Sequence, residues 1–164
     1  MRFTYCGKRV KRDDFGHPLS TFPPCAVISY KEKATELLRS VLTKTGYAFD
    51  EFGDGNGTCF AQVVVEDREE YEEFVRDFKT LYYRETHAVG DTVFVIVKDM
   101  STFRPKVVKG IIARMTDKGI RITEPEVYRG VAHTEWTFPW SAIHKEVFDT
   151  DTAANRTLKN IGGE

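Results

Sequence analysis

Residues 25–46 read CAVISYKEKATELLRSVLTKTG, and this stretch decides the fold class. Its first six residues are mostly apolar and favour a buried strand. Ser29 and Glu32 have the spacing of a capping box, and Gly46 stands where a helix C-cap belongs. An amphipathic helix is therefore predicted over residues 30–45. Its apolar face consists of residues at helical spacing: Ala34, Leu37, Leu38, Val41 and Leu42.

The chain continues with two strand-like runs and a second helix. YAFDEF at 47–52 and TCFAQVVVE at 58–66 flank a glycine-rich turn, which predicts a pair of strands. Asp67 and Glu70 repeat the helix-start spacing. A second apolar stripe follows, made of Tyr71, Phe74, Val75, Phe78, Leu81 and Tyr82. Because two amphipathic helices need a shared apolar surface, we predict an α+β domain over residues 25–84 in the order strand, helix, strand, strand, helix (βαββα).

After residue 88 the sequence consists of short β-rich runs between turns. The runs are GDTVFVIVKD, PKVVKGIIARMTDKGIRIT, EVYRGVAHTEWTFPW and KEVFDT, and TDKG is a strong tight-turn signal. Residues 88–164 are predicted to form a small SH3-like β-barrel, or a strongly bent sheet, with a terminal helix capped by Thr150 or Asp151. Residues 1–24 are predicted to be an irregular basic segment in which Arg2–Tyr5 can form a short strand.

Composition excludes several classes of protein. With 164 residues, 41% hydrophobic residues and a formal net charge of −1, the chain suits one compact domain or two small ones, without a global bias toward nucleic acid or membranes. No apolar run is long enough for a transmembrane helix, and no secretory signal is recognisable. Cys6, Cys25 and Cys59 are odd in number and widely spaced, which makes a poor disulfide framework. We expect a soluble, cytoplasmic protein in a reducing environment, with no cofactor and no metal.

GDGNG at residues 53–57 has the letters found at the centre of many calcium-binding loops. Placing Asp54 and Asn56 at the third and fifth positions of such a loop puts Phe52 first and Val63 twelfth, so two obligatory ligands are missing. Asn and Gly tolerate the positive φ values of hairpin turns. We therefore predict a turn between strands.

The histidines raise the question of catalysis. His87 in THAV and His133 in HTE match a two-histidine phosphoesterase pattern only in part, and His144 in HKE belongs to no zincin or deaminase signature. No base or orienting residue accompanies them in the sequence, so we assign no catalytic residue. A histidine-dependent phosphoesterase stays as an alternative that requires His87 and His133 to lie side by side.

Short basic clusters and nearby aromatic residues are the candidates for nucleic-acid contact. The cations are Lys8, Arg9, Lys11, Arg12, Arg104, Lys106 and Lys109, and the aromatic candidates are Phe103, Tyr128 and Trp136. Acidic runs such as EDREEYEEF balance these clusters, so the charge pattern favours a mixed, solvated surface. Trp136, Phe138 and Trp140 alternate, and we expect them mainly in the barrel core.

The second predicted helix carries a dense acidic face. Acidic residues in its first turn favour the helix dipole, which explains part of the pattern. The rest of the face suits contact with a basic protein surface, including one that normally holds nucleic acid. The candidate contact residues are Glu69, Glu72, Glu73 and Asp77.

VGDTVFVIVKD, KVVKGIIARM and IHKEVFDTDTAANRTL carry a resemblance to a group of known proteins. They are similar to small uncharacterised proteins of phages and mobile elements of Gram-positive and gut bacteria, whose pattern joins a GDTVYVI-like strand to a later I-G-K-x-V-F-x-T-x-E-E-A run. His144 stands in place of the glycine of that pattern, and TAAN stands in place of its acidic run. The resemblance covers about residues 88–160 and implies an SH3-like barrel, a terminal helix and a phage or mobile-element origin.

The expected function follows from this resemblance by analogy. Small phage proteins without catalytic constellations often bind host machinery, including defence nucleases. The analogy implies a non-enzymatic, anti-CRISPR-like inhibitor or modulator of a host protein or ribonucleoprotein, acting in the bacterial cytoplasm. A nucleic-acid-binding SH3-like module is the alternative, and the oligomeric state is left open.

Overall fold

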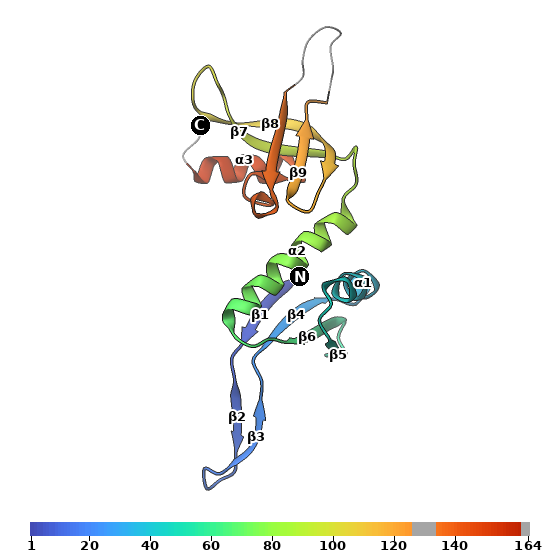
Figure 1. The fold of residues 1–164 in the computed structure, drawn as a ribbon, viewed down its shortest axis with the longest axis vertical. Coiled ribbons are helices and arrows are strands. Elements are labelled where there is room, and N and C mark those ends of the chain that lie inside the picture. Colours follow the sequence, from blue (N-terminus) through green and yellow to red (C-terminus); the bar gives the residue numbers. More distant parts are fainter. Residues whose placement is uncertain (126–133, 162–164) are drawn as a thin grey trace. The chain divides into compact units, whose positions relative to one another are not determined.

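The chain is a mixed α+β protein, as its sequence predicts. The computed structural model describes residues 1–125 and 134–161, and these contain three α-helices and eleven β-strands (Figure 1). The fold divides into two compact units, Met1–Glu85 and Thr86–Glu164, which we call unit 1 and unit 2.

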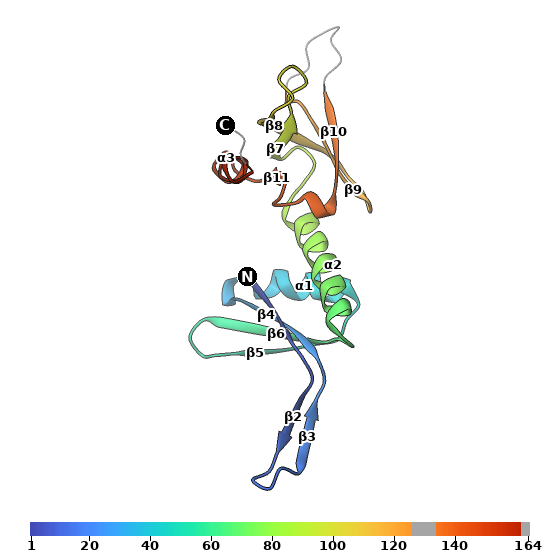
Figure 2. The same cartoon turned by 90° about the vertical axis from the view of Figure 1, so that its left-hand side faces the viewer.

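Unit 1 is built on a four-stranded antiparallel sheet. Its strand order is β1-β4-β6-β5. The strands are β1 (Arg2–Cys6), β4 (Cys25–Lys31), β6 (Thr58–Val64) and β5 (Phe49–Gly53), and the helices are α1 (Thr35–Thr45) and α2 (Arg68–Thr86). Both helices pack against one face of the sheet (Figure 2). The core between them consists of Ala26, Ile28, Tyr30, Leu38, Val41, Leu42, Ala61, Val63, Val65, Phe74 and Phe78.

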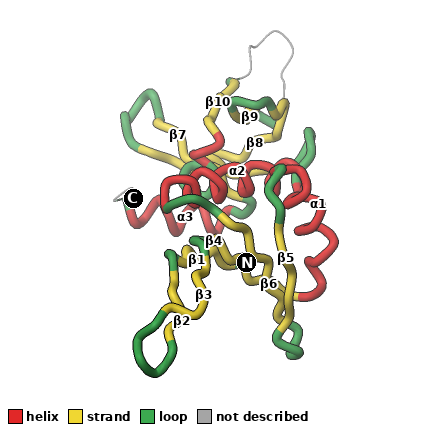
Figure 3. The backbone as a smooth tube through the Cα atoms, turned by 60° about the horizontal axis from the view of Figure 1, so that its bottom comes forward, coloured by secondary structure: helices red, strands yellow, loops and turns green. Residues whose placement is uncertain are grey.

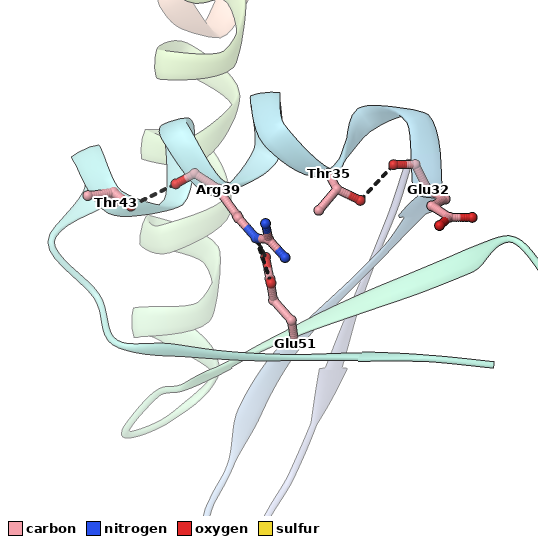
Figure 4. A network of polar contacts seen from close by, with 5 residues as sticks. All are labelled: Glu32, Thr35, Arg39, Thr43 and Glu51. Atoms are coloured by element: carbon pink, nitrogen blue, oxygen red, sulfur yellow. Dashed lines mark hydrogen bonds and ion pairs between the residues drawn. The ribbon is translucent and has the colours of Figure 1, made fainter. Parts of the chain in front are cut away.

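The capping box predicted at Ser29 is wrong. Strand β4 continues to pair with β6 up to Lys31, so Ser29 lies inside the strand. A short 3-10 helix follows at Glu32–Ala34, and α1 begins at Thr35, whose hydroxyl donates to the Glu32 carbonyl at 2.7 Å (Figure 4). The C-cap prediction is confirmed, because Gly46 has φ 81° and ends the helix in the left-handed region.

The predicted start of α2 is confirmed. The Asp67 carboxylate accepts a hydrogen bond from the Glu70 amide at 2.9 Å, and the Glu70 carboxylate accepts one from the Glu66 amide at 3.0 Å. The first contact satisfies an amide of the first turn that the helix itself leaves without a partner, and the second holds the residue two positions before the helix.

Ion pairs join the helices of unit 1 to the rest of its structure. Arg39 of α1 donates from Nε to both carboxylate oxygens of Glu51 on β5, at 3.0 and 2.8 Å (Figure 4). Lys44 near the end of α1 pairs with Glu85 near the end of α2. Because the Arg39 and Glu51 side chains are partly exposed, we expect this pair to position α1 more than to stabilise it.

The short strand expected at Arg2–Tyr5 is confirmed, but the rest of residues 1–24 is not irregular, which corrects the sequence prediction. Residues 2–6 form β1, the edge strand beside β4. Two further strands, β2 (Arg9–Arg12) and β3 (Pro18–Phe22), form a separate two-stranded antiparallel ribbon that projects beyond the four-stranded sheet (Figure 1, Figure 3). The prolines and charges of this segment indicated a loop, but cross-strand pairing extends through it.

Unit 2 contains a curled five-stranded antiparallel sheet (Figure 2). Its order is β10-β9-β8-β7-β11, and a register shift between Ile112 and Arg114 interrupts the pairing of β8 with β9. The elements are β7 (Thr92–Lys98), β8 (Pro105–Met115), β9 (Gly119–Thr123), β10 (Glu135–Pro139), β11 (Val147–Phe148) and α3 (Asp151–Asn160). Helix α3 buries Ala154 against Ile96 and Phe148.

Two local predictions in unit 2 are confirmed. TDKG forms the turn between β8 and β9, where the Thr116 amide donates to the Gly119 carbonyl at 2.9 Å. Of the two proposed caps of the last helix, Thr150 is the N-cap, and its hydroxyl accepts from the Ala153 amide at 3.2 Å.

Candidate binding surface

The β2–β3 ribbon is the most exposed regular element of unit 1. All four residues of β2 and all five residues of β3 are exposed. A two-stranded hairpin without a covering layer is only marginally stable by itself. The ribbon therefore needs local interactions to hold its shape.

A hydrogen-bonded turn supplies those interactions at the ribbon tip. The Asp13 carboxylate accepts from the amides of Phe15 at 2.9 Å and His17 at 2.8 Å. Gly16 takes φ 84°, and its carbonyl accepts from the Arg12 guanidinium at 3.0 Å. The tip is thus a defined turn, and Asp13 acts within it as a structural residue.

One face of the ribbon combines cations with an aromatic ring. Arg9 lies directly opposite Phe22 and Lys11 opposite Ser20, so these four side chains share a face. The Arg9 guanidinium carbon lies 5.8 Å from the centre of the Phe22 ring, within the range of a cation–π contact. A shallow depression is lined by Arg9, Val10, Lys11 and Phe22. Phosphate groups and flat bases are bound by this combination of side chains.

The ribbon also exposes apolar side chains. The exposed fractions are 38% for Val10, 85% for Phe15, 61% for Leu19 and 45% for Phe22. Sequence reasoning singled out the cations Lys8, Arg9, Lys11 and Arg12 but not these residues. The missing signal was the pairing of residues 9–12 with 18–22, which places the apolar and basic residues on one projecting element.

The other candidate cations belong to unit 2. Arg104 precedes β8, and Lys106 and Lys109 lie on it, all three exposed. The Lys106 ammonium lies 3.4 Å from the Asp99 carboxylate, so part of its charge is compensated locally.

The loop between β7 and β8 places Phe103 at the surface. Phe103 is 67% exposed, has φ 58°, and lies beneath the Lys98 ammonium at 5.3 Å. The adjoining Asp99 accepts hydrogen bonds from Ser101, which lower the pKa of its carboxyl to about 2. This loop is a second, smaller site where an exposed aromatic ring lies next to a cation.

The remaining aromatic candidates differ from Phe103. Trp136 is half-buried: it lies opposite Ile122, and its ring is 3.9 Å from where a Cβ on Gly110 would be. Phe138 is buried, and the Trp140 indole donates to the Thr116 carbonyl at 2.9 Å. Tyr128 lies outside the described residues.

The acidic candidates all lie on the exposed side of α2. Glu69, Glu72, Glu73 and Asp77 are exposed. Glu72 lies 3.8 Å from Arg68, and the exposed Arg76 is one turn further along from Glu72 and Glu73. The surface is therefore acidic with interspersed arginines, and its net charge is less negative than the acidic residues alone imply.

His87 is engaged with neighbouring residues in unit 2. Its Nε2 lies 2.7 Å from the Asp149 carboxylate and its Nδ1 lies 2.9 Å from the Thr86 hydroxyl, while 16% of the side chain is exposed. These contacts join the segment before β7 to the segment before α3. His133, the partner required by a phosphoesterase, lies outside the described residues. His144 is exposed and has φ 64°.

The GDGNG segment forms the turn between β5 and β6, as predicted. The Asp54 carboxylate accepts from the Asn56 amide at 2.7 Å and the Thr58 amide at 3.2 Å. Gly55 and Gly57 have φ 77° and 88°, so the backbone conformation of the turn explains the presence of glycine at both positions, and no bound ion is needed to explain it. Among the described residues, no group of three or more His, Cys, Asp or Glu side chains is placed to hold a metal ion.

Comparisons with known proteins return no relative. No protein-family model, no curated protein and no solved structure matches the chain. In the described part of the chain, none of the helices combines the length and the apolar character needed to span a bilayer.

Proposed function

We propose that this chain is a non-enzymatic binding protein that recognises a ribonucleoprotein of a bacterial host, with the β2–β3 ribbon as its principal contact element. The observation that carries the proposal is the ribbon itself. It is exposed on both strands, it is held by its turn, and it presents cations and apolar side chains together.

A ribonucleoprotein fits the two charged surfaces of unit 1. The ribbon carries Arg9, Lys11 and Arg12, and Lys8 directly precedes it; these cations suit the phosphates of RNA. The Phe22 ring beside Arg9 suits stacking on an unpaired base. Helix α2 presents Glu69, Glu72, Glu73 and Asp77, which suit the basic protein surface of such a complex.

The resemblance of residues 88–160 makes the proposal more specific. The resemblance implies an origin in a phage or mobile element, with unit 2 as an SH3-like barrel and the host cytoplasm as the place of action. A CRISPR nuclease is a ribonucleoprotein that acts against phages and mobile elements, so such an element would benefit from inhibiting it. Under this proposal the chain acts by occupying a surface of the nuclease, and none of its histidines takes part in catalysis.

A second candidate is a nucleic-acid-binding module that needs no protein partner. The contact of Arg9 with Phe22 favours it, because cations next to exposed rings bind single strands directly. Arg104, Lys106 and Lys109, with Phe103 nearby, would then supply further contacts from unit 2. The two candidates differ in whether naked RNA or DNA binds as tightly as the intact complex.

The test compares two charge-matched double variants of the full chain. Arg9→Gln with Lys11→Gln removes two ribbon cations. Lys31→Gln with Lys33→Gln removes two exposed cations of unit 1 that lie outside the ribbon. Each tagged protein is incubated with host lysate, with and without ribonuclease, and the captured protein and RNA are identified and quantified.

We expect the ribbon variant to lose capture and the control variant to keep it, with ribonuclease reducing capture by the wild type. Binding of labelled naked RNA is then measured against salt concentration. Each phosphate contact with a single strand contributes about 0.7 to the magnitude of the slope of log K against log salt concentration. If naked RNA is the partner, the loss of two contacts should therefore reduce that magnitude by about 1.4 in the ribbon variant. Equal capture by both variants would contradict the role of the ribbon.

A further inference from the structure

Strand β1 leads into the ribbon and strand β4 leads out of it, and each carries a cysteine at a position that faces the other strand. Cys6 is the last residue of β1 and Cys25 is the first residue of β4, and they lie directly opposite each other in the antiparallel register. Residues 7–24, which contain the whole ribbon, are inserted between them. In the sequence they are widely spaced, so their proximity follows from the strand pairing.

The register gives the geometry that a disulfide requires. Directly opposite residues of an antiparallel pair have Cα atoms about 4.5–5.5 Å apart and side chains on the same face. Disulfides span Cα separations of about 4.4–6.8 Å. Both thiols are free in this structure.

We propose that Cys6 and Cys25 form a redox-modifiable dithiol that closes into a disulfide at the base of the ribbon. A small-molecule disulfide such as oxidised glutathione is the oxidant. The Cys6 thiolate attacks it, forming a mixed disulfide and releasing one glutathione thiolate. Cys25 then attacks the Cys6 sulfur and releases the second glutathione thiolate. Both cysteine S–H bonds are lost, one protein disulfide forms, and oxidised glutathione is reduced to two glutathione molecules.

The environments of the two thiols assign this order of attack. Cys25 is 1% exposed, whereas Cys6 is half-buried and is the thiol that an oxidant reaches. Burial, followed by the neighbouring Cys6, raises the pKa of the Cys25 thiol, which suits a resolving cysteine better than an attacking one. Lys8 and Arg9 lie two and three residues after Cys6, and their charges attract the carboxylates of glutathione.

Closure would fix the base of the ribbon. The disulfide would tie the exit of β1 to the entry of β4, so the paired ribbon strands could not separate at their base. Whether this changes ribonucleoprotein binding rests on the proposed function, whereas formation of the bond does not.

The experiment measures thiol oxidation in the full chain carrying Cys59→Ser, which leaves only the two cysteines of interest. The protein is equilibrated at a series of ratios of oxidised to reduced glutathione, both folded and in urea. Samples are quenched with acid and unfolded so that the buried Cys25 is accessible, free thiols are then alkylated, and intact and peptide masses are recorded. Wild type is run in parallel, with circular dichroism confirming that the variant is folded.

We expect the folded chain to lose two hydrogens in a Cys6–Cys25 linked peptide. Half-oxidation should require about 10- to 100-fold less oxidised glutathione than in urea, because the fold holds the thiols together. Cys6→Ser should leave Cys25 alkylatable. Equal or harder oxidation of the folded chain, or glutathione adducts without closure, would overturn the proposal. Neither outcome of the oxidation experiment changes what the capture experiment says about the role of the ribbon in binding.

Discussion

Gly119 is the position where the structure makes its sharpest stability prediction. It is the first residue of β9 and lies opposite Pro139 of β10. A Cβ atom added there would lie 2.0 Å from the Phe138 carbonyl oxygen and 3.0 Å from the Cα of Pro139. Because these are backbone atoms, no side-chain rotation relieves the clash, and the two strands must separate. Overpacking that side chains can absorb costs about 1–3 kcal/mol, so we expect Gly119→Ala to cost at least about 3 kcal/mol.

Tryptophan fluorescence during urea unfolding tests this prediction. Both tryptophans of the chain, Trp136 and Trp140, lie in unit 2, so the signal reports the unit that contains Gly119. With a urea dependence of about 1–3 kcal/mol per molar, the midpoint should fall by about 1–3 M. Gly53→Ala in unit 1, followed by far-UV circular dichroism, is the control for a Gly→Ala change without a clash, because its Cβ would meet nothing nearer than 3.7 Å. A loss below about 1 kcal/mol for Gly119→Ala would refute the close approach of β9 and β10.

Three further substitutions and titrations test separate features. His144→Gly should stabilise unit 2 by up to about 1 kcal/mol in the same urea assay. A non-glycine residue at φ 64° costs about 1–2 kcal/mol, and the larger backbone entropy that glycine loses on folding offsets part of the gain. A destabilised variant would show that contacts of the histidine side chain outweigh the backbone strain. Asp67→Ala should cost about 1 kcal/mol and speed amide exchange in the first turn of α2, and unchanged exchange would contradict the cap. The Asp99 carboxyl has a pKa lowered to about 2 by Ser101, so its stabilising contacts persist above its ordinary pKa and are lost as the pH falls through about 2. An NMR titration should therefore place its midpoint near 2, Ser101→Ala should raise that midpoint, and an ordinary midpoint in the wild type would contradict the hydrogen bonds.

Local signals in the sequence predicted the elements that are stabilised locally. The Asp67 cap, the Gly46 C-cap, the TDKG turn and the Thr150 cap are all made within a few residues of chain. Each depends on a side chain or a glycine at a fixed offset, which can be read directly from the sequence. The apolar stripes of α1 and α2 belong to the same category, because helical spacing determines which residues face the sheet.

The sequence-based prediction missed the features that depend on pairing between distant segments of the chain. Ser29 and Glu32 have the spacing of a capping box, yet the pairing of Lys31 with Thr58 extends the strand and delays the helix. Residues 1–24 lack the alternation of a buried strand, because both strands of the ribbon are exposed. The juxtaposition of Cys6 with Cys25 also depends on the register of β1 with β4. No local pattern encodes any of the three.

The basic residues of the ribbon have an explanation that needs no partner. Strands with unpaired edges are protected against aggregation by charged residues, especially lysine, and the ribbon has two such edges. Edge protection does not explain Leu19 or Phe15, because exposed apolar side chains on a free hairpin favour aggregation. Burial against a partner does explain them.

Leu19→Ser separates the two explanations. Leu19 is 61% exposed, so we expect folding to be unchanged while capture of the ribonucleoprotein falls, since the substitution leaves every ribbon cation in place. Lys11→Gln, one pair further toward the base, serves as the charge-removing comparison and should also lower capture. If Leu19→Ser improved solubility and left capture unchanged, the apolar side chains would have no role at the interface, and contact would depend on charge alone.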